Sequence, residues 1–416
     1  MKVLFLSQIV PYPPHGGVLQ RGYNIVRELS REAQVHLLAF VHPDVLPTEE
    51  ACRDSQVVLS KYCEAVEYFS LWPKTSSLHR IAGLAAGAVS SQPFSVLAHR
   101  SALFQRRVAE LVATKDFDLI HVDTIALAQF LDQRWSIPTV LTHHNIESQL
   151  MERRAGAESS LLARLYLRRE TRKLLAYEAE MSGTFDVNVF VAQTDEQTLT
   201  ERVSGLRTAV VSNGVDVDYF TPNRGKDSPT LIYAGGMNMF ANRDAVMFFL
   251  NEIWPLIRNQ VPDVRFFAVG QDPPKELLEL AARDPQIVVT GYVNDVRPLV
   301  RDASVYVVPL RVGGGTRLKV LDAMAMGKAM VSTSIGCEGL DVLPDKHLLV
   351  ADSLEQFSDK TVKLLLDPSR RNTLGCAARE LVEQRYSWRM IGGQLLNAYH
   401  LAIENRRQMV MDHSPQ

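Results

Sequence analysis

Three consecutive glycines, followed by two cationic side chains, lie in the segment 309–327, where an apolar strand predicted at Ala303–Leu310 gives way to a helix. Unpaired N–H groups and the positive end of the helix dipole favour an anion at such a helix N-terminus. Arg317 and Lys319 add positive charge, and Asp322 adds a hydrogen-bond acceptor further along the helix. The backbone donors would belong to Gly313, Gly314, Gly315 and Thr316. We therefore predict a site for a phosphate joined to a hydroxylated sugar, with a tight turn that binds nothing as the alternative.

Two further glycine-rich turns follow predicted strands. Gly16 and Gly17 end the segment 11–17 after the first strand, and adjacent glycines let a ligand approach the backbone closely. The segment 233–244 opens the second half of the chain and carries Arg243 near a helix start. Its glycines are Gly235 and Gly236. Both turns predict contacts with an anion. For the segment 11–17 the alternative is a rigid turn that binds nothing, and for the segment 233–244 it is a plain strand-to-helix turn.

The segment 290–295 ends another strand of the second half. Tyr292 and Val293 offer backbone groups and an aromatic ring that suit a nucleobase. A surface turn is the favoured interpretation when this segment is taken alone.

His144 lies in the segment 142–147, which carries two histidines, an amide and a carboxylate at the end of a first-half strand. Ligands of doubly wound sheets bind beyond the carboxyl ends of the strands, so a catalytic role and a structural polar cluster are equally open for the pair His143 and His144. A zinc site is the weaker interpretation, since no third ligand has a suitable spacing. We therefore predict no metal ion.

The composition bounds the class of protein. A chain of 416 residues with 46% hydrophobic and 22% charged residues is long enough for two domains, each with its own core. The net charge of −2 gives no basic field for a nucleic acid partner. Four cysteines without metal-ligand or disulfide spacing favour a reducing compartment and hence a cytoplasmic protein. No apolar run approaches the roughly 20 residues that span a bilayer, and the apolar N-terminus fits a buried strand better than a signal peptide.

Predicted strands and helices alternate along the chain, which favours the α/β class with parallel sheets. The pattern restarts after the breaker-rich segment 222–229, where we place a linker. We therefore predict two doubly wound Rossmann-like domains with the ligand in an interdomain cleft. The predicted boundaries are residues 1–207 and 208–386 for the two domains, 387–408 for a helix that packs back on the first domain, and 409–416 for a tail.

The sequence resembles the two-domain GT-B glycosyltransferases, and among them family 4, over essentially its whole length. The most specific matches are Pro13–Gly17, Ser212–Asp216, Gly235–Asp244, Thr290–Asp295, Gly313–Gly327 and Tyr386–Trp388. The pattern Arg-x-Gly-Gly-Gly-Thr-Arg-Leu-Lys is similar to bacterial sugar transferases of exopolysaccharide clusters. The resemblance implies an N-terminal acceptor-binding domain and a C-terminal nucleotide-sugar-binding domain. It also implies transfer of a hexose to a glycan or lipid-linked acceptor in polysaccharide biosynthesis, with retention and with neither a cofactor nor a metal ion.

Two departures from the family pattern bear on the donor. The family signature has two glutamates, whose places hold Gly314 and Asp322 here. Asp322 can accept hydrogen bonds from ribose hydroxyls, whereas Gly314 offers only its backbone, so the donor sugar stays open. The family's Arg and Lys after the first strand of the second domain are also missing, and we assign the diphosphate charge to Arg243, Arg317 and Lys319. By the same resemblance, His144 matches the cleft histidine that contacts the donor sugar near the reacting carbon.

Two other functions remain as alternatives. A noncatalytic nucleotide-sugar-binding protein is suggested by the missing glutamate. A nucleotide-sugar epimerase would need clustered acids and bases that the sequence does not show. Separately, the basic segment Leu161–Lys173 suits anionic lipid headgroups at the inner face of the cell membrane, with a solvated helix face as the favoured alternative.

Overall fold

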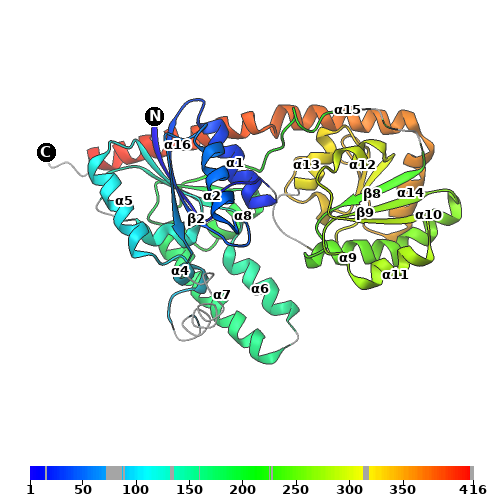
Figure 1. Cartoon of the computed structure of the whole chain (residues 1–416), viewed down its shortest axis with the longest axis horizontal. Coiled ribbons are helices and arrows are strands. Elements are labelled where there is room, and N and C mark those ends of the chain that lie inside the picture. The colour runs from blue at the N-terminus through cyan, green and yellow to red at the C-terminus, as the bar shows by residue number, and fades with distance from the viewer. Residues whose placement is uncertain are drawn as a thin grey trace. The chain divides into compact units, whose positions relative to one another are not determined.

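The computed structural model of the chain describes residues 1–14, 16–71, 87, 90–131, 135–158, 160–223, 225, 228–312 and 318–412. It comprises two compact units, both drawn in Figure 1. Unit 1 contains Met1–Ser212 and Ile391–Gln416, and unit 2 contains Asn213–Met390. Each unit is an α/β structure with its own parallel sheet.

The described residues of unit 1 form seven parallel strands in the order β3-β2-β1-β4-β5-β6-β7. They are β1 (Lys2–Ser7), β2 (Gln34–Val41), β3 (Ala65–Ser70), β4 (Leu119–Val122), β5 (Thr139–His143), β6 (Val187–Phe190) and β7 (Thr208–Val210). Every residue of β4, β5 and β6 is buried, as expected for parallel strands covered on both faces. The direction of winding changes between β1 and β4, so the carboxyl ends of these two strands mark a ligand-binding position.

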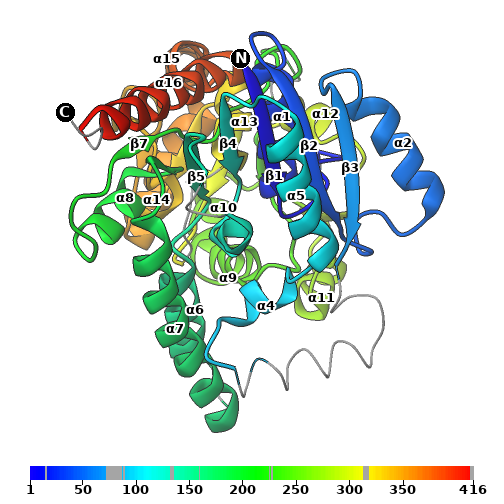
Figure 2. The same cartoon turned by 90° about the vertical axis from the view of Figure 1, so that its left-hand side faces the viewer.

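Two helices of unit 1, α2 (Glu49–Leu59) and α5 (Ala102–Thr114), begin where the sequence supplies a hydrogen-bond cap. The side chains of Thr48 and Ser101 accept hydrogen bonds from the N–H groups of Ala51 and Phe104. The helical segments are α1 (Gly17–Leu29), α2 (Glu49–Leu59), α4 (Phe94–Ala98), α5 (Ala102–Thr114), the 3₁₀ helix η2 (Ile125–Phe130), α6 (Glu147–Ala157), α7 (Leu161–Ser182), α8 (Gln193–Thr200) and most of α16 (Trp388–Asp412). Helices α6 and α7 form a hairpin that extends beyond the sheet in two perpendicular views (Figures 1 and 2).

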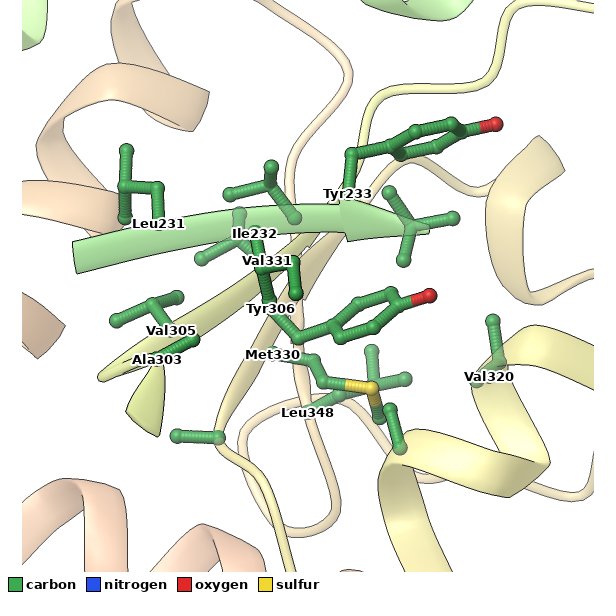
Figure 3. Close-up of a cluster of buried hydrophobic side chains, with 14 of the residues drawn as sticks. Leu231, Ile232, Tyr233, Ala303, Val305, Tyr306, Val320, Met330, Val331 and Leu348 are labelled. Carbon is green, nitrogen blue, oxygen red and sulfur yellow. The ribbon is translucent and has the colours of Figure 1, made fainter. Parts of the chain in front are cut away.

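In the part of unit 2 that the structure describes, six parallel strands follow the order β10-β9-β8-β11-β12-β13. They are β8 (Thr230–Ala234), β9 (Arg265–Val269), β10 (Ile287–Gly291), β11 (Val305–Val308), β12 (Met330–Ser332) and β13 (Leu349–Val350). The helical segments are α9 (Phe240–Phe248), the π-helical turn η3 (Phe249–Ile253), α10 (Trp254–Gln260), α11 (Lys275–Arg283), α12 (Arg297–Asp302), α13 (Leu318–Ala325), the 3₁₀ turn η4 (Ile335–Cys337), α14 (Leu354–Leu366) and α15 (Pro368–Arg385). Apolar side chains of the central strands pack with those of α13 to form the core (Figure 3).

The predicted fold class is confirmed, because both units are doubly wound and Rossmann-like. The chain divides after Ser212, later than the predicted boundary at residue 207, since β7 pairs with β6 in the first sheet. The predicted linker at 222–229 follows Phe220, which is buried in the unit 2 core, so unit 2 begins before it. The segment from Ile391 onward belongs to unit 1. The cleft between the units stays a prediction.

Two further observations concern the chain as a whole. All four cysteines are free thiols. Within the described ranges, no helix combines the length and the apolar character needed to cross a membrane.

Candidate functional site

Two tyrosine hydroxyls reach the carboxyl end of strand β8 in the unit 2 sheet. Tyr233 comes near the end of β8 and Tyr306 lies in β11, and both rings are buried. Their hydroxyls point to the side of the core where Val320 of α13 lies (Figure 3). The Tyr306 hydroxyl donates a hydrogen bond to the carbonyl oxygen of Ala234 at 3.3 Å. The two hydroxyls therefore provide polar groups at the edge of an otherwise apolar core.

The predicted glycine turn after β8 is held against the neighbouring strand. The N–H of Gly235 donates to the carbonyl oxygen of Val269 at 2.8 Å. A Cβ on Gly235 would lie 2.6 Å from Nζ of Lys319, and one on Gly236 would lie 2.7 Å from Oδ1 of Asn238. The missing side chain at Gly235 therefore lets the Lys319 ammonium lie directly against the backbone.

Lys319, in the first turn of α13, is fixed above this turn by a small polar network. Its Nζ donates to the hydroxyl of Tyr233 at 2.8 Å and to Oδ1 of Asn242 at 2.5 Å. Tyr233 donates to the same Oδ1 at 2.7 Å, and the Asn242 amide donates to the carbonyl oxygen of Gly236 at 2.7 Å. The ammonium also lies 4.6 Å from the centre of the Tyr233 ring. These uncharged groups orient a cation at the carboxyl edge of the sheet.

Asp322 follows on the same helix. Burial raises the pKa of its carboxyl group to about 7. In the described part of the chain, Oδ1 of Asp322 has no hydrogen-bond partner. Burial, and then the negative charge of Asp322, raise the pKa of the Tyr306 hydroxyl. Asp322 is therefore a buried carboxyl group with an open acceptor, as expected of a group that receives a hydroxyl from a ligand.

Asp322→Asn is expected to change how stability depends on pH. Because the folded-state pKa of Asp322 lies above its ordinary value of 3.8, its contribution to stability is complete below pH 3.8 and is lost as the pH rises through about 7. The variant, which cannot ionise, should gain stability relative to the wild type across this window, by at most on the order of 4 kcal/mol. Urea unfolding at acidic and alkaline pH measures the difference. Asp359→Asn, at an exposed position on α14, is the control, and an Asp322→Asn curve that follows it would contradict the assignment.

Two further arginines of unit 2, Arg243 and Arg311, lie in or against helix α9. Arg243, predicted to contact phosphate, is half-buried in the first turns of α9. Arg311 was not predicted. It forms an ion pair with Asp244 at 2.5 Å and lies 4.2 Å from the ring centre of Phe248. Arg311 lines a cavity of about 520 Å³ with Asp244 and Phe248.

The predicted nucleobase segment follows β10. Gly291 has φ +66°, which turns the chain beside β9, where its carbonyl oxygen accepts a hydrogen bond from the N–H of Gly270 at 3.1 Å. Tyr292 is 62% exposed, and Val293 packs against the unit 2 core. Tyr292 therefore faces solvent, whereas Val293 belongs to the core, and the exposed tyrosine ring is the side chain on which a base could stack.

Five of the predicted residues lie outside the described residues. They are Gly313, Gly314, Gly315, Thr316 and Arg317. Their predicted contacts with phosphate stay predictions.

Gly16 and Gly17 form the start of α1 in unit 1. Gly16 precedes the helix with φ +95°, a conformation that favours glycine, and Gly17 is the first helical residue. Both are exposed. Among the described residues no side chain caps this helix, so its first N–H groups are open to a ligand.

His144 is held by a carboxylate at the carboxyl edge of the unit 1 sheet. Its Nε2 lies 3.1 Å from Oδ1 of Asp123, the residue that follows β4. Burial by itself would raise the pKa of Asp123, but His144 and His121 lower it further, to well below the usual range. Asp123 is therefore ionised and accepts a hydrogen from Nε2 of His144, which leaves Nδ1 of His144 as the nitrogen for another partner.

A second layer of polar groups supports this pair. His121 is fully buried, and its ring accepts or donates hydrogen bonds with Tyr399 at 2.8 Å and Thr142 at 3.2 Å. Burial lowers the pKa of His121 despite the neighbouring Asp123. The buried guanidinium of Arg21, whose pKa burial lowers to about 10, donates to the carbonyl oxygens of residues 211 and 212. Nε2 of His121 lies 3.9 Å from Oδ1 of Asp123, and the Ser7 hydroxyl donates to Oδ2 of Asp123 at 3.4 Å. These two contacts orient Asp123 and, through it, the imidazole of His144.

The adjacent His143 has a structural role. Its Nε2 lies 3.0 Å from Oδ1 of Asn188, and its ring stacks on Phe190 with the centres 4.7 Å apart. Burial lowers the pKa of His143 to about 4, so the ring is neutral. The structural interpretation of this histidine pair therefore describes His143, the last residue of β5, whereas His144 follows the strand.

The structure brings Gly235, Gly236 and Lys319 together and puts Asp322 on the same helix as Lys319. Gly16, Gly17 and His144 belong to unit 1.

Sequence reasoning missed Tyr233, Asn242, Asp123 and Arg311. Asp123 directly follows a buried strand, as His144 does, and that position was a usable signal. Asn242 gave no such signal. It holds Lys319, which is 77 residues away in the sequence and meets Asn242 only in the folded structure.

Across the described ranges, no group of three or more His, Cys, Asp and Glu side chains is arranged to hold a metal ion.

Comparison with known proteins identifies the family. Residues 15–219 match the model described as Glycosyltransferase Family 4, and residues 228–367 match that described as Glycosyl transferases group 1. The chain is 20% identical to an uncharacterized 44.6 kDa protein in the cps region of Klebsiella pneumoniae, over 92% of this chain and 96% of that protein. It is 25% identical to a GDP-mannose-dependent monoacylated alpha-(1-6)-phosphatidylinositol monomannoside mannosyltransferase of Corynebacterium glutamicum, over 44% of this chain and 54% of that enzyme.

A solved structure shows the same fold. HepE of Anabaena, crystallised in complex with UDP, superposes with a TM-score of 0.65 and 15% identity, over 96% of this chain and 100% of that one. The two family models together cover most of the sequence, and both units have the predicted Rossmann-like architecture. The chain is therefore a GT-B glycosyltransferase of the family 4 type.

Proposed function

We propose that the protein transfers a sugar from a nucleotide diphosphate sugar to a glycan or lipid-linked acceptor. The observation that carries this proposal is the position of Lys319. Its ammonium is held 2.5 Å from Asn242 and directly over the Gly235 backbone, at the sheet edge where doubly wound folds bind ligands. The similarity to the UDP complex of HepE supports a nucleotide as part of the donor.

Lys319 would stabilise the leaving group. Cleavage of the bond between the anomeric carbon and the phosphate oxygen leaves negative charge on the nucleoside diphosphate, while the sugar becomes cationic. A cation that is already oriented meets this charge without reorganisation. We assign Arg243 and the predicted Arg317 the same role, and the N–H groups of the glycine-rich segment 313–316 would add backbone donors.

Asp322 would receive the ribose hydroxyls. Its buried, unpaired Oδ1 suits a hydroxyl donor, and ligand hydroxyls that donate to it would favour the ionised carboxylate. Tyr292, exposed at the end of β10, would lie against the base. Gly314 carries no carboxylate for the sugar hydroxyls, so we propose that backbone groups of its segment hold the sugar.

His144 would contact the donor sugar near the reacting carbon. In a reaction with retention on a single face, the leaving phosphate oxygen can take the acceptor's proton, so no protein carboxylate has to act as a nucleophile. Nδ1 of His144 would then serve as a polar contact to the sugar, with Asp123 fixing the ring.

The biological setting is part of the same proposal. The cps-region relative from Klebsiella pneumoniae supports a role in bacterial polysaccharide biosynthesis, and the free thiols fit a protein of the cytoplasm. A noncatalytic nucleotide-sugar-binding protein remains the second candidate, because Gly314 replaces a carboxylate of the family signature.

A donor panel tests the proposal. Thermal unfolding with UDP-, GDP-, ADP- and TDP-sugars should show stabilisation by one nucleotide class, because a ligand that binds only the folded state at a hundred times its Kd adds about 2.7 kcal/mol. The matching donor should also be consumed with turnover when incubated with candidate acceptors. Binding without turnover would favour the noncatalytic candidate, and the absence of any shift across the panel would contradict donor binding itself.

A further inference from the structure

The α6–α7 hairpin of unit 1 carries three exposed leucines near its free end. Leu161, Leu162 and Leu165 are 62%, 79% and 54% exposed. Residues 161 and 165 are one helical turn apart, and residue 162 lies beside 165, so the three side chains form a continuous apolar surface at the start of α7. Figures 1 and 2 both show this hairpin extending away from the unit 1 sheet. Clustered exposed leucines of this kind mark an interaction surface more often than isolated ones do.

The hairpin also concentrates positive charge. Between Arg153 and Lys173 the sequence contains seven basic and two acidic residues, although the whole chain has a net charge of −2. Arg168, Arg169 and Arg172 are exposed and follow the leucines along the same side of α7. In the portion of the chain that is described, these three arginines form no ion pair. Their positive charge therefore faces solvent directly behind the apolar surface.

The base of the hairpin is fixed by buried polar contacts. Glu170 is 2% exposed and accepts hydrogen bonds from the N–H of Phe94 at 2.8 Å and from Lys173 at 2.5 Å. Lys173 also donates to the carbonyl oxygen of Gly87 at 2.6 Å. At the start of α6, the N–H of Ser148 donates to Glu178 of α7 at 3.1 Å. The hairpin is thus anchored at its base, while its leucines and arginines remain outside these contacts.

We propose that the free end of this hairpin docks on the surface of an anionic lipid bilayer. Leu161, Leu162 and Leu165 would enter the interface between headgroups and acyl chains, and the arginines would contact anionic headgroups. The combination of an apolar end with a basic flank fits such a surface, because each Lys or Arg near an anionic leaflet strengthens binding roughly fivefold. The proposal goes beyond the assigned transfer reaction and does not depend on the donor.

Vesicle flotation of the full-length protein tests this docking. Vesicles of phosphatidylcholine with phosphatidylglycerol should carry the protein, and vesicles of phosphatidylcholine alone should not. The variant Arg168→Gln/Arg169→Gln/Arg172→Gln should lose about a hundredfold in partitioning, and Leu161→Ser/Leu162→Ser/Leu165→Ser should lose about tenfold or more. Higher salt should weaken binding of the wild type by screening the arginines.

Matched variants separate docking from general effects. Leu103 of α5 is as exposed as Leu161, and Arg53 and Arg106 are exposed arginines of the same unit. Leu103→Ser and Arg53→Gln/Arg106→Gln should float like the wild type, and all variants should melt like it because the replaced side chains are exposed. The proposal is overturned if the wild type ignores anionic vesicles or if the leucine variant floats unchanged. It is also overturned if sedimentation shows a dimer that the leucine variant abolishes, since a second copy would then cover this surface.

Discussion

Lys319→Ala is expected to lower kcat by about two to three orders of magnitude, the usual cost of removing one oriented group that meets charge developing in the transition state. The ammonium lies over the Gly235 backbone and is held by Tyr233 and Asn242, so its charge is in place before the diphosphate leaves. Steady-state transfer kinetics with the donor found by thermal shift measure the effect. Because the interaction strengthens as the bond breaks, kcat should fall more than donor affinity.

Two variants test the position of Lys319 separately from its charge. Lys363→Ala removes a lysine from an exposed position on α14 of the same unit and should leave kcat unchanged. Asn242→Ala keeps the ammonium but removes one of the oxygens that hold it, so we expect a smaller loss than for Lys319→Ala. If Lys319→Ala is folded and transfers sugar at the wild-type rate, the assignment of this ammonium to the leaving group is wrong.

Strands and helices were predictable from the sequence where a local pattern of apolar and polar residues determines the secondary structure. The buried runs of β1, β4, β5 and β11 stand out as apolar segments, because parallel strands between helix layers need apolar side chains on both faces. The first residue of α1 was harder to predict from the sequence. The amphipathic pattern of residues 22–31 predicts a helix that begins at Gly22, yet α1 begins at Gly17, because two glycines without a capping side chain do not signal a helix start.

The candidate site shows where local pattern is insufficient. The Gly235–Gly236 turn and Lys319 are each visible as motifs, but Tyr233, which precedes the turn and holds Lys319, lies 86 residues from that lysine in the sequence. The same holds for Asp123 and His144, which come from different strands and meet only because β4 and β5 are neighbours. Residue types therefore indicated the kind of ligand, whereas the partners that orient each side chain required the sheet topology.

His144→Ala is expected to lower kcat by about two orders of magnitude while changing the affinity for the nucleoside diphosphate by less than about threefold. The imidazole is oriented by Asp123, whose lowered pKa keeps it ionised and fixes a hydrogen on Nε2 of His144. In the proposed reaction, Nδ1 then contacts the sugar, where positive charge develops, and has no part in holding the nucleotide. Transfer kinetics and calorimetric titration with the nucleoside diphosphate measure the two quantities on one preparation.

The neighbouring histidine supplies a matched control for this prediction. His143→Ala removes an identical side chain, but one that is buried against Phe190 and bonded to Asn188, so we expect it to lower stability by about 2–4 kcal/mol. The fraction that folds should transfer sugar at nearly the wild-type rate. Asp123→Asn should reproduce part of the His144→Ala defect, because the ring would lose the carboxylate that sets its tautomer. Equal losses of transfer and of nucleotide affinity in His144→Ala would instead place this histidine in the nucleotide site, where Asp123 would hold it for binding and not for chemistry.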